Sequence, residues 1–412
     1  MSNLLTDDTK VIMLLCGVFG KDYSIRPLTQ TEYNALARWL NSEKMRPEDM
    51  LKSENIGSAA MGSGINQERL KTLLGRGVQL GFAVEEWQRN GIWVISRSDK
   101  EYPTRYKKHL KDKAPPLIFG VGDKSLLHGG GIAIVGSRNI DADGEAFTRK
   151  TAELCVKNRM PIISGGARGV DQIAMVAALD EGGISIGVLA DNLLKKSLER
   201  NARNSISDRR LLLMSPYHPY ARFTVGTAMG RNKLIYAMAD YGLVVSAEHI
   251  KGGTWAGATE ELKRNNSRTV FVRSGENVPP GNKNLLDLGA LEWPEIKNRK
   301  KLNQQLADLA ANRMKKKEQE NLSLFDFQEQ DIQQAEEAKN TEKKDISIVT
   351  SDCTIYKAVL PIIMNHLGSP TTINELSKTL NVSKTQLNSW IKKAVNEGKI
   401  RKLSRPARYE RN

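Results

Sequence analysis

Two glycine-rich turns, each preceded by a short apolar run, are the parts of this sequence best suited to bind an anion. The first turn reads Gly136, Ser137 and Arg138, and the second reads Ser164, Gly165, Gly166, Ala167, Arg168, Gly169, Val170 and Asp171. Glycine lets the main chain approach an anion closely, and the positive end of the following helix dipole favours negative charge. Because each turn also carries an arginine, phosphate is a better ligand here than a neutral metabolite.

A third glycine turn and further basic residues extend this candidate site. The additional residues are Arg231, Asn232, Lys233, Lys251, Gly252, Gly253 and Thr254. We expect the cations to lie at strand or helix ends on one side of a sheet, where they neutralise consecutive phosphates of a single strand, aided by backbone amides. Asn232 would meet a base edge or a sugar, and Asp171 would hold an arginine or cap the helix that follows it. For each arginine taken singly, the alternative to phosphate binding is an ion pair on the protein surface.

The sequence offers little for catalysis. None of its five histidines pairs with Cys, Asp or Glu at metal-ligand spacing, and no Lys-Ser/Thr signature of a P-loop follows a glycine turn. We therefore expect no metal, no cofactor and no enzymatic activity. The alternative is the turn 252–261, which carries Glu260 and Glu261 and is similar to the glycine-threonine-glutamate turn of nucleoside monophosphate phosphoribohydrolases. A carboxylate there would act on an N-glycosidic bond. The other interpretation is that both are ordinary helix residues, whose negative charges interact favourably with the positive end of the helix dipole or face solvent.

Charge and composition agree with a polyanionic partner. The chain has 412 residues, with 62 Lys and Arg against 47 Asp and Glu, so its formal net charge is +15. This excess favours nucleic acid or an anionic surface, although an ordinary basic protein is the alternative. The three cysteines lie far apart in apolar stretches, and no run of about 20 apolar residues could span a bilayer. We predict a cytoplasmic protein with no membrane segment.

Apolar periodicity predicts a doubly wound α/β domain. Strands are expected at 132–135, 161–163, 184–189, 211–214, 242–245 and 269–272, with helical patterns between them. Such alternation gives a parallel sheet that helices cover on both faces, with the ligand site beyond the carboxyl ends of the strands. Two short strands, at 92–95 and 117–119, are predicted to extend the edge of this Rossmann-like sheet. Residues before them show helical spacing.

Four regions follow from these patterns. They are a helical N-terminal module at 1–95, the Rossmann-like DNA-binding domain at 96–295, a charged linker at 296–350 and a winged-helix domain at 351–412. The linker is expected to be either a long solvated helix or disordered. Within the linker, the apolar patch Asn321–Phe327 would either dock back on the α/β domain or bind a partner, because its segment Asn321 to Phe325 resembles the pentapeptide that binds the replication sliding clamp. The basic winged helix would contact either DNA or protein.

The motifs together resemble the DNA-processing protein A family, also called DprA or Smf, from about Trp93 to Ala290 and again over the tail. The matching segments are Asp99–Pro103, Pro115–Leu117, Ile134–Arg138, Ser164–Asp171, Arg231–Ile235 and Leu286–Ala290. The resemblance implies an extended Rossmann fold that binds single-stranded DNA without strong sequence preference. It also implies a homodimer that loads a RecA-type recombinase during natural transformation or related recombination. The role of holding phosphates would fall to Ser137, Arg138, Gly166, Arg168, Arg231 and Lys233.

Two segments depart from the family pattern. The family's glycine-leucine-aspartate turn is replaced by Ala190–Leu194, followed by a divergent and unusually basic stretch at 195–229. The family's later serine-glycine-serine is replaced by Lys251–Trp255. These differences concern the recombinase contact and the role in transformation, whereas the fold expected from the remaining motifs is unaffected.

Overall fold

The computed structural model describes residues 5–19, 25–264, 266–295, 301–313, 355–380, 382, 384–403 and 408–411. It divides into two compact units, Met1–Asn321 and Leu322–Asn412. The first unit contains the glycine turns and is described first.

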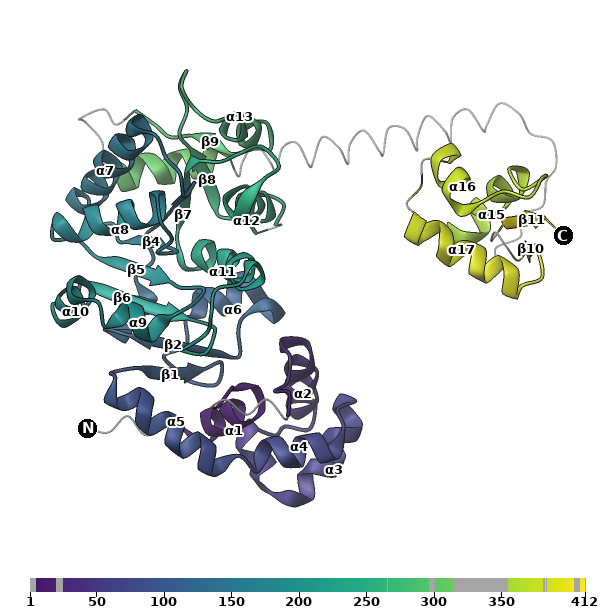
Figure 1. Ribbon diagram of the computed structural model, residues 1–412, viewed down its shortest axis with the longest axis horizontal. Coiled ribbons are helices and arrows are strands. Elements are labelled where there is room, and N and C mark those ends of the chain that lie inside the picture. Colours follow the sequence, from purple (N-terminus) through teal and green to yellow (C-terminus); the bar gives the residue numbers. More distant parts are fainter. Residues whose placement is uncertain are drawn as a thin grey trace, which may run out of the picture. The chain divides into compact units, whose positions relative to one another are not determined.

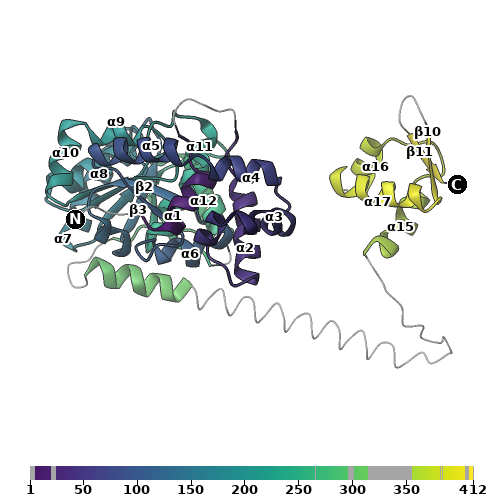
Figure 2. The same cartoon turned by 90° about the horizontal axis from the view of Figure 1, so that it is seen from below.

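The first unit begins with a group of short helices, which Figure 2 shows from below. They are α1 (Asp7–Cys16), α2 (Gln30–Ser42), the 3-10 helix η1 (Pro47–Leu51), α3 (Ser53–Ser63), α4 (Gln67–Leu74) and α5 (Gly77–Arg89). Side-chain caps fix several of their starts. Thr29 and Glu32 form a capping box at α2, and Thr6 accepts a hydrogen bond from the Thr9 amide at α1. The predicted helical character of this region is confirmed.

A nine-stranded sheet forms the centre of the unit. Its strands are β1 (Trp93–Ser96), β2 (Leu117–Val121), β3 (Ile132–Gly136), β4 (Ile162–Ser164), β5 (Ser185–Val188), β6 (Leu211–Ser215), β7 (Tyr241–Ser246), β8 (Thr269–Val272) and β9 (Leu291–Glu292). The order is β1-β2-β6-β5-β4-β3-β7-β8-β9, in which β3 to β9 are parallel and β1 and β2 form an antiparallel edge. The predicted parallel sheet and its edge extension are confirmed. Strand β9 was not predicted.

Helices cover both faces of this sheet, as Figure 1 shows. One face carries α7 (Ala142–Lys157), α8 (Val170–Asp180), α9 (Leu193–Ser197) and α10 (Arg200–Ser207). The other face carries α6 (Thr104–Leu110), α11 (Val225–Met238), α12 (Gly252–Leu262) and α13 (Pro280–Asp287). Two short 3-10 helices, η2 (Lys111–Lys113) and η3 (Lys124–His128), flank β2. Because both faces are covered, strands such as β3 and β8 are buried along almost their whole length, and their sequences are continuous apolar runs.

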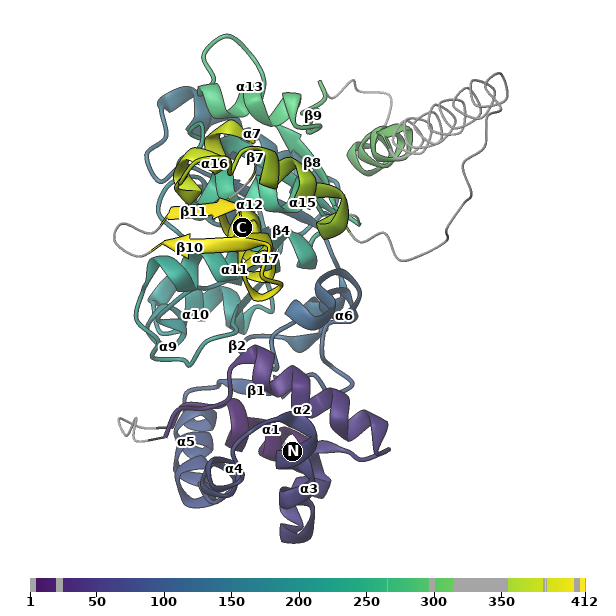
Figure 3. The same cartoon turned by 90° about the vertical axis from the view of Figure 1, so that its right-hand side faces the viewer.

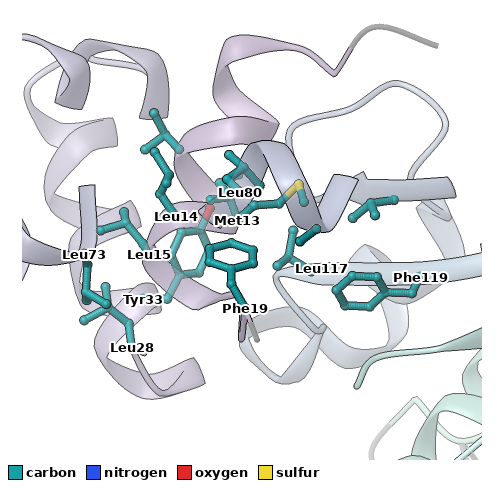
Figure 4. Close-up of a cluster of buried hydrophobic side chains, with 14 of the residues drawn as sticks. Met13, Leu14, Leu15, Phe19, Leu28, Tyr33, Leu73, Leu80, Leu117 and Phe119 are labelled. Carbon is teal, nitrogen blue, oxygen red and sulfur yellow. The ribbon is translucent and has the colours of Figure 1, made fainter. Parts of the chain in front are cut away.

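The N-terminal helices share one hydrophobic cluster with the edge of the sheet. Figure 4 shows Leu117 and Phe119 of β2 in the same cluster as Met13, Leu15 and Phe19, with Leu117 on the side of Phe19 that faces β2. The same cluster continues to Leu211 and Leu213 of β6. The predicted boundary at residue 95 falls inside β1. Because the shared cluster crosses this boundary, the helical module and the edge of the sheet have a common core.

Part of the predicted charged linker packs on the first unit. Residues 302–313 form a helix, and Leu302 and Leu306 are fully buried against the cluster that contains Ile132 and Phe271. This segment is therefore not a solvated helix. The patch Asn321–Phe327, with its expected clamp-binding segment, lies outside the described residues. No helix in the described ranges is both long and apolar enough to cross a membrane.

The second unit contains the elements expected of its sequence. They are α15 (Ile355–Asn365), α16 (Ile373–Thr379), α17 (Lys384–Asn396) and the antiparallel hairpin of β10 (Ile400–Leu403) and β11 (Arg408–Arg411). An isolated bridge joins Thr371 to Tyr409 of the hairpin. Leu376, Leu387 and Ile391 are buried together between the helices. The identification of this unit as a winged helix stays a prediction.

One buried amide connects α13 to the ends of two strands, and its removal tests how strongly this region is held. Asn282 is fully buried; its Oδ1 accepts the Ala247 amide, and its Nδ2 donates to the carbonyls of Val245 and Arg273. Asn282→Ala leaves these groups unpaired, so we expect the free energy of unfolding to fall by roughly 3 kcal/mol. Chemical denaturation of the full chain measures this. The neighbouring exposed Lys283→Ala is the control, and equal stability of both variants would contradict the argument.

Candidate functional site

A cavity, called the main cavity below, lies where the strand order of the sheet reverses. From β3 the chain moves outward through β4, β5 and β6, and then returns to β7 on the other side of β3. At such a reversal the loops after neighbouring strands diverge and leave a crevice at the carboxyl edge. The main cavity has a volume of about 400 Å³ and lies between Gly136 at the end of β3 and Ser246 at the end of β7.

Most of the residues expected in the site line this cavity. Those that do are Gly136, Ser137, Arg138, Asp171, Arg231, Asn232, Lys251, Gly252, Gly253 and Thr254. The prediction that they gather at the carboxyl edge of the sheet therefore agrees with the structure. Their local roles differ from the predicted ones in several cases.

Asp171 organises the two glycine turns. Its carboxylate is buried behind the cavity, and its Oδ2 accepts the Gly165 amide at 3.1 Å. The backbone amides of Ala167, Gly136 and Gly165 act to lower the pKa of this carboxyl. The Gly165 amide is thus directed to a protein carboxylate, and not to the crevice as the sequence suggested. Asp171 does not cap α8, whose N-cap is Gly169.

Arg231 is buried opposite Asp171. It lies inside α11 and not at a helix end, which corrects the expected position. Its Nη1 donates to the carbonyl of Val188 at 2.7 Å, whereas its buried Nε has no described hydrogen-bond partner. A Cβ on Gly165 would overlap Arg231 Nη1 and would lie 2.5 Å from Asp171 Oδ2, so only glycine fits beneath this pair.

Burial affects the charge of both groups. It raises the pKa of Asp171, while the Arg231 charge and the three amides act in the opposite direction. It lowers the pKa of Arg231, which the Asp171 carboxylate opposes. Each group therefore stabilises the charged form of the other. Arg231 lines the cavity, and its buried Nε is a donor without a described hydrogen-bond partner.

The first glycine turn places a cation and an aromatic ring together at the cavity. Arg138 is exposed, and its guanidinium carbon lies 5.0 Å from the centre of the Phe223 ring. Phe223 is 45% exposed and comes from the loop between β6 and α11. The sequence did not identify Phe223 as a site residue, because no pattern in its irregular loop indicates where the ring points.

The start of α12 forms the opposite wall of the cavity. Lys251 is its N-cap and provides no side-chain cap, so the amides of the first turn have no such partner. Thr254 Oγ1 donates to the Gly136 carbonyl at 3.0 Å and joins this wall to β3. Asn232 Nδ2 donates to the Gly253 carbonyl at 2.9 Å, so the asparagine holds α12 against α11. A helix start with free amides suits a phosphate.

Several expected site residues support the cavity without lining it. Ser164 is buried and donates to the Ile134 carbonyl at 2.6 Å. Gly166 and Gly169 have positive φ values of 64° and 86°, which the tight turn after β4 requires. Arg168 is exposed beside the cavity, and its Nη2 donates to Asn139 Oδ1 at 2.5 Å. It therefore remains on the same rim.

Lys233 lies on the other side of α11. It lines a second cavity of about 330 Å³ with Lys113 and Glu260, and burial lowers its pKa. Only Asn232, Met229 and Gly257 border both cavities. The expectation that Lys233 joins Arg138 and Arg231 in one pocket is wrong for this reason: residues 231 and 233 point to different sides of a helix.

The two carboxylates of the hydrolytic alternative do not reach the main cavity. Glu261 is buried, with its carboxylate 2.9 Å from His109 Nε2 and 3.3 Å from Arg264 Nε. It also accepts the Arg268 amide at 2.6 Å. Glu260 borders the second cavity, 3.4 Å from Arg264. These carboxylates connect helices, and the geometry gives no support to nucleotide hydrolysis.

The loop that carries Phe223 is attached to the N-terminal helices. His218 packs against both Trp87 of α5 and Phe119 of β2, with ring centres 5.6 Å and 6.5 Å away. Burial lowers the pKa of His218, so its neutral form is favoured in this contact. The Tyr220 hydroxyl donates to Glu86 of α5. The loop over the cavity is thus fixed from a distant part of the sequence.

No cluster of three or more His, Cys, Asp or Glu that could hold a metal occurs among the described residues. The polar groups of the main cavity include the donors Arg138, Arg231, Lys251 and the start of α12, which outnumber the carboxylates of Asp171 and Glu248. Such a set is suited to an anion and not to a cation.

Comparisons with known proteins agree with this fold. The family model described as DNA recombination-mediator protein A matches residues 93–302. DprA of Bacillus subtilis is 30% identical over 199 residues, which are 47% of this chain and 64% of that protein. Protein Smf of Escherichia coli is 31% identical over 182 residues, 43% of this chain and 48% of that protein. The chain thus spans less than two thirds of the length of either relative.

A solved structure extends the likeness over more of the chain. The X-ray structure of DprA from Streptococcus pneumoniae covers 70% of this chain and 95% of that chain, with a TM-score of 0.56 and 22% identity. At this identity the match concerns the fold. The family model covers the glycine turns, Arg231 and the whole nine-stranded sheet. With half of its residues matched in this way, the chain belongs to the DNA recombination-mediator protein A family, that of DprA and Smf.

Proposed function

We propose that the cavity between β3 and β7 binds the phosphate backbone of single-stranded DNA, and that the protein mediates recombination by presenting this strand to a RecA-type recombinase. The observation that carries the proposal is Arg231, a buried cation whose Nε has no described partner and which faces the cavity. A buried guanidinium without a full set of acceptors favours a ligand that supplies them.

The other walls of the cavity support a nucleic-acid strand over a free anion. Arg138 and the start of α12 provide further phosphate contacts, while the half-exposed Phe223 provides a face on which a base can stack. In this mode of binding, bases stack on the ring and phosphates contact the cations, but no side chain reads the base edges. Binding without strong sequence preference follows from this. The family description, which names recombination mediation, supports the same role.

The remaining parts of the proposal concern partners and location. Recombinase loading, a homodimer, a role in natural transformation and a cytoplasmic location stay predictions. Binding of duplex DNA by the second unit is the other candidate role for nucleic acid. Removal of residues 346–412 distinguishes the two, because our proposal requires that single-strand affinity remains in the first unit.

Arg138→Ala tests the cavity without disturbing the core, because this arginine is exposed. We expect affinity for oligo-dT to fall about tenfold and the salt dependence to become shallower, by about 0.7 in the log–log slope for each phosphate that is no longer neutralised. Fluorescence anisotropy at several salt concentrations measures both. Lys150→Ala, an exposed cation on α7, is the charge-matched control. Equal affinity of both variants would reject the cavity as the binding site.

Gly165→Ala tests the buried pair without changing any charge. The added Cβ displaces the Arg231 guanidinium or the Asp171 carboxylate, so we expect single-strand affinity to fall at least tenfold. Gly81→Ala on the exposed side of α5 meets nothing within 4 Å and is the control. Circular dichroism checks that both variants are folded. A folded Gly165→Ala variant with unchanged affinity would show that the pair does not act in binding.

A further inference from the structure

The helices α9 and α10 carry exposed cations that the cavity does not use. Lys195, Arg200 and Arg203 are exposed, and none of them is ion-paired to a described residue. Between residues 192 and 210 there are six Lys and Arg against only Glu199 and Asp208. Because Asp208 is paired with Arg210 at 3.0 Å, Glu199 is the one acid left in this stretch to offset the exposed cations.

The strand order places the start of α9, which carries Lys195, in a row with the cavity. Strand β3 ends at the cavity, its neighbour β4 ends at the turn with Arg168, and the next strand, β5, leads into α9. Neighbouring strands are about 4.8 Å apart, so the row extends roughly 10 Å along the carboxyl edge. Helix α10, which carries Arg200 and Arg203, then returns from α9 towards the start of β6 along the border of the unit (Figures 1 and 3).

Direct contacts hold α9 against both neighbours of the cavity. On one side, Lys196 Nζ donates to the carbonyl of Gly166 in the β4 turn at 3.2 Å. On the other side, the amides of Asn192 and Leu194 donate to the carbonyls of Ala221 and Pro219, in the loop that carries Phe223. The helix therefore bridges the glycine turn and the loop, which places Lys195 and Lys196 beside the cavity rim.

We infer that Lys195, Arg200 and Arg203, together with Arg168, form a second phosphate-binding segment that takes up single-stranded DNA as it leaves the cavity. This inference rests on the proposed function of the cavity and adds a direction for the strand: from β3 over the β4 turn onto α9 and α10. A protein with acidic side chains would meet the same charges, but the continuity with a phosphate-binding cavity favours the nucleic-acid backbone.

Strand length separates the two binding segments in an experiment. The triple variant Lys195→Ala, Arg200→Ala and Arg203→Ala is compared with the wild type, as full-length chains, on oligo-dT of about 6 and about 30 nucleotides. We expect the short strand, which fits the cavity alone, to bind with unchanged affinity. The long strand should bind at least tenfold more weakly, with a log–log salt slope reduced by about 2 because three phosphates are no longer neutralised.

A second triple variant is the charge-matched control. Lys150→Ala, Lys157→Ala and Lys263→Ala removes three exposed cations from α7 and the end of α12, away from the row, and should leave both affinities close to wild type. An equal effect of the two triple variants on the long strand would overturn the inference, because net charge alone would then explain it. So would equal losses of affinity on both strand lengths, or no loss on either.

The outcome also separates this inference from the proposed function. If Arg138→Ala weakens the short strand while the α9–α10 variant leaves the long strand unchanged, the cavity binds DNA and the second segment does not. If the wild type binds neither oligonucleotide, the proposed function itself fails. If the long strand is unaffected while an acidic peptide such as poly-glutamate loses affinity, the surface binds protein and our inference is wrong.

Discussion

The site depends on one buried carboxylate facing one buried guanidinium. Asp171 accepts the amide of Gly165 in the second glycine turn and thereby links the end of β4 to the start of α8. Arg231 balances this charge from α11 across the topological reversal of the sheet. Because a buried ion needs its partners, neither turn can shift without losing part of this arrangement.

Much of the fold was predictable from the sequence, for a physical reason. The parallel strands are covered on both faces, so each appears as an uninterrupted apolar run, and the glycine turns mark their ends. Strand β9 was missed because its two residues make no pattern. The packing of the helix at 302–313 was not predictable, because Leu302 and Leu306 are sparse among polar neighbours although both are buried.

The site was predictable as a region and not in its details. The residue types and the strand pattern predicted that the cations lie at the carboxyl edge of the sheet. The direction in which each side chain points depends on its position in a helix, which the pattern did not give. Arg231 and Lys233 are two positions apart on α11 and border different cavities. The position of Asp171 opposite Arg231, and the ring of Phe223 beside Arg138, result from tertiary contacts between segments far apart in the chain.

The contact between α5 and the loop over the cavity has an architectural consequence. Trp87 and Glu86 hold His218 and Tyr220, and these precede Phe223 by only a few residues. The N-terminal helices consequently support the wall of the cavity that Phe223 forms, and they are a structural part of the site. A protein that binds those helices and displaces them would therefore also move the Phe223 ring, without contact to Arg138 or Arg231.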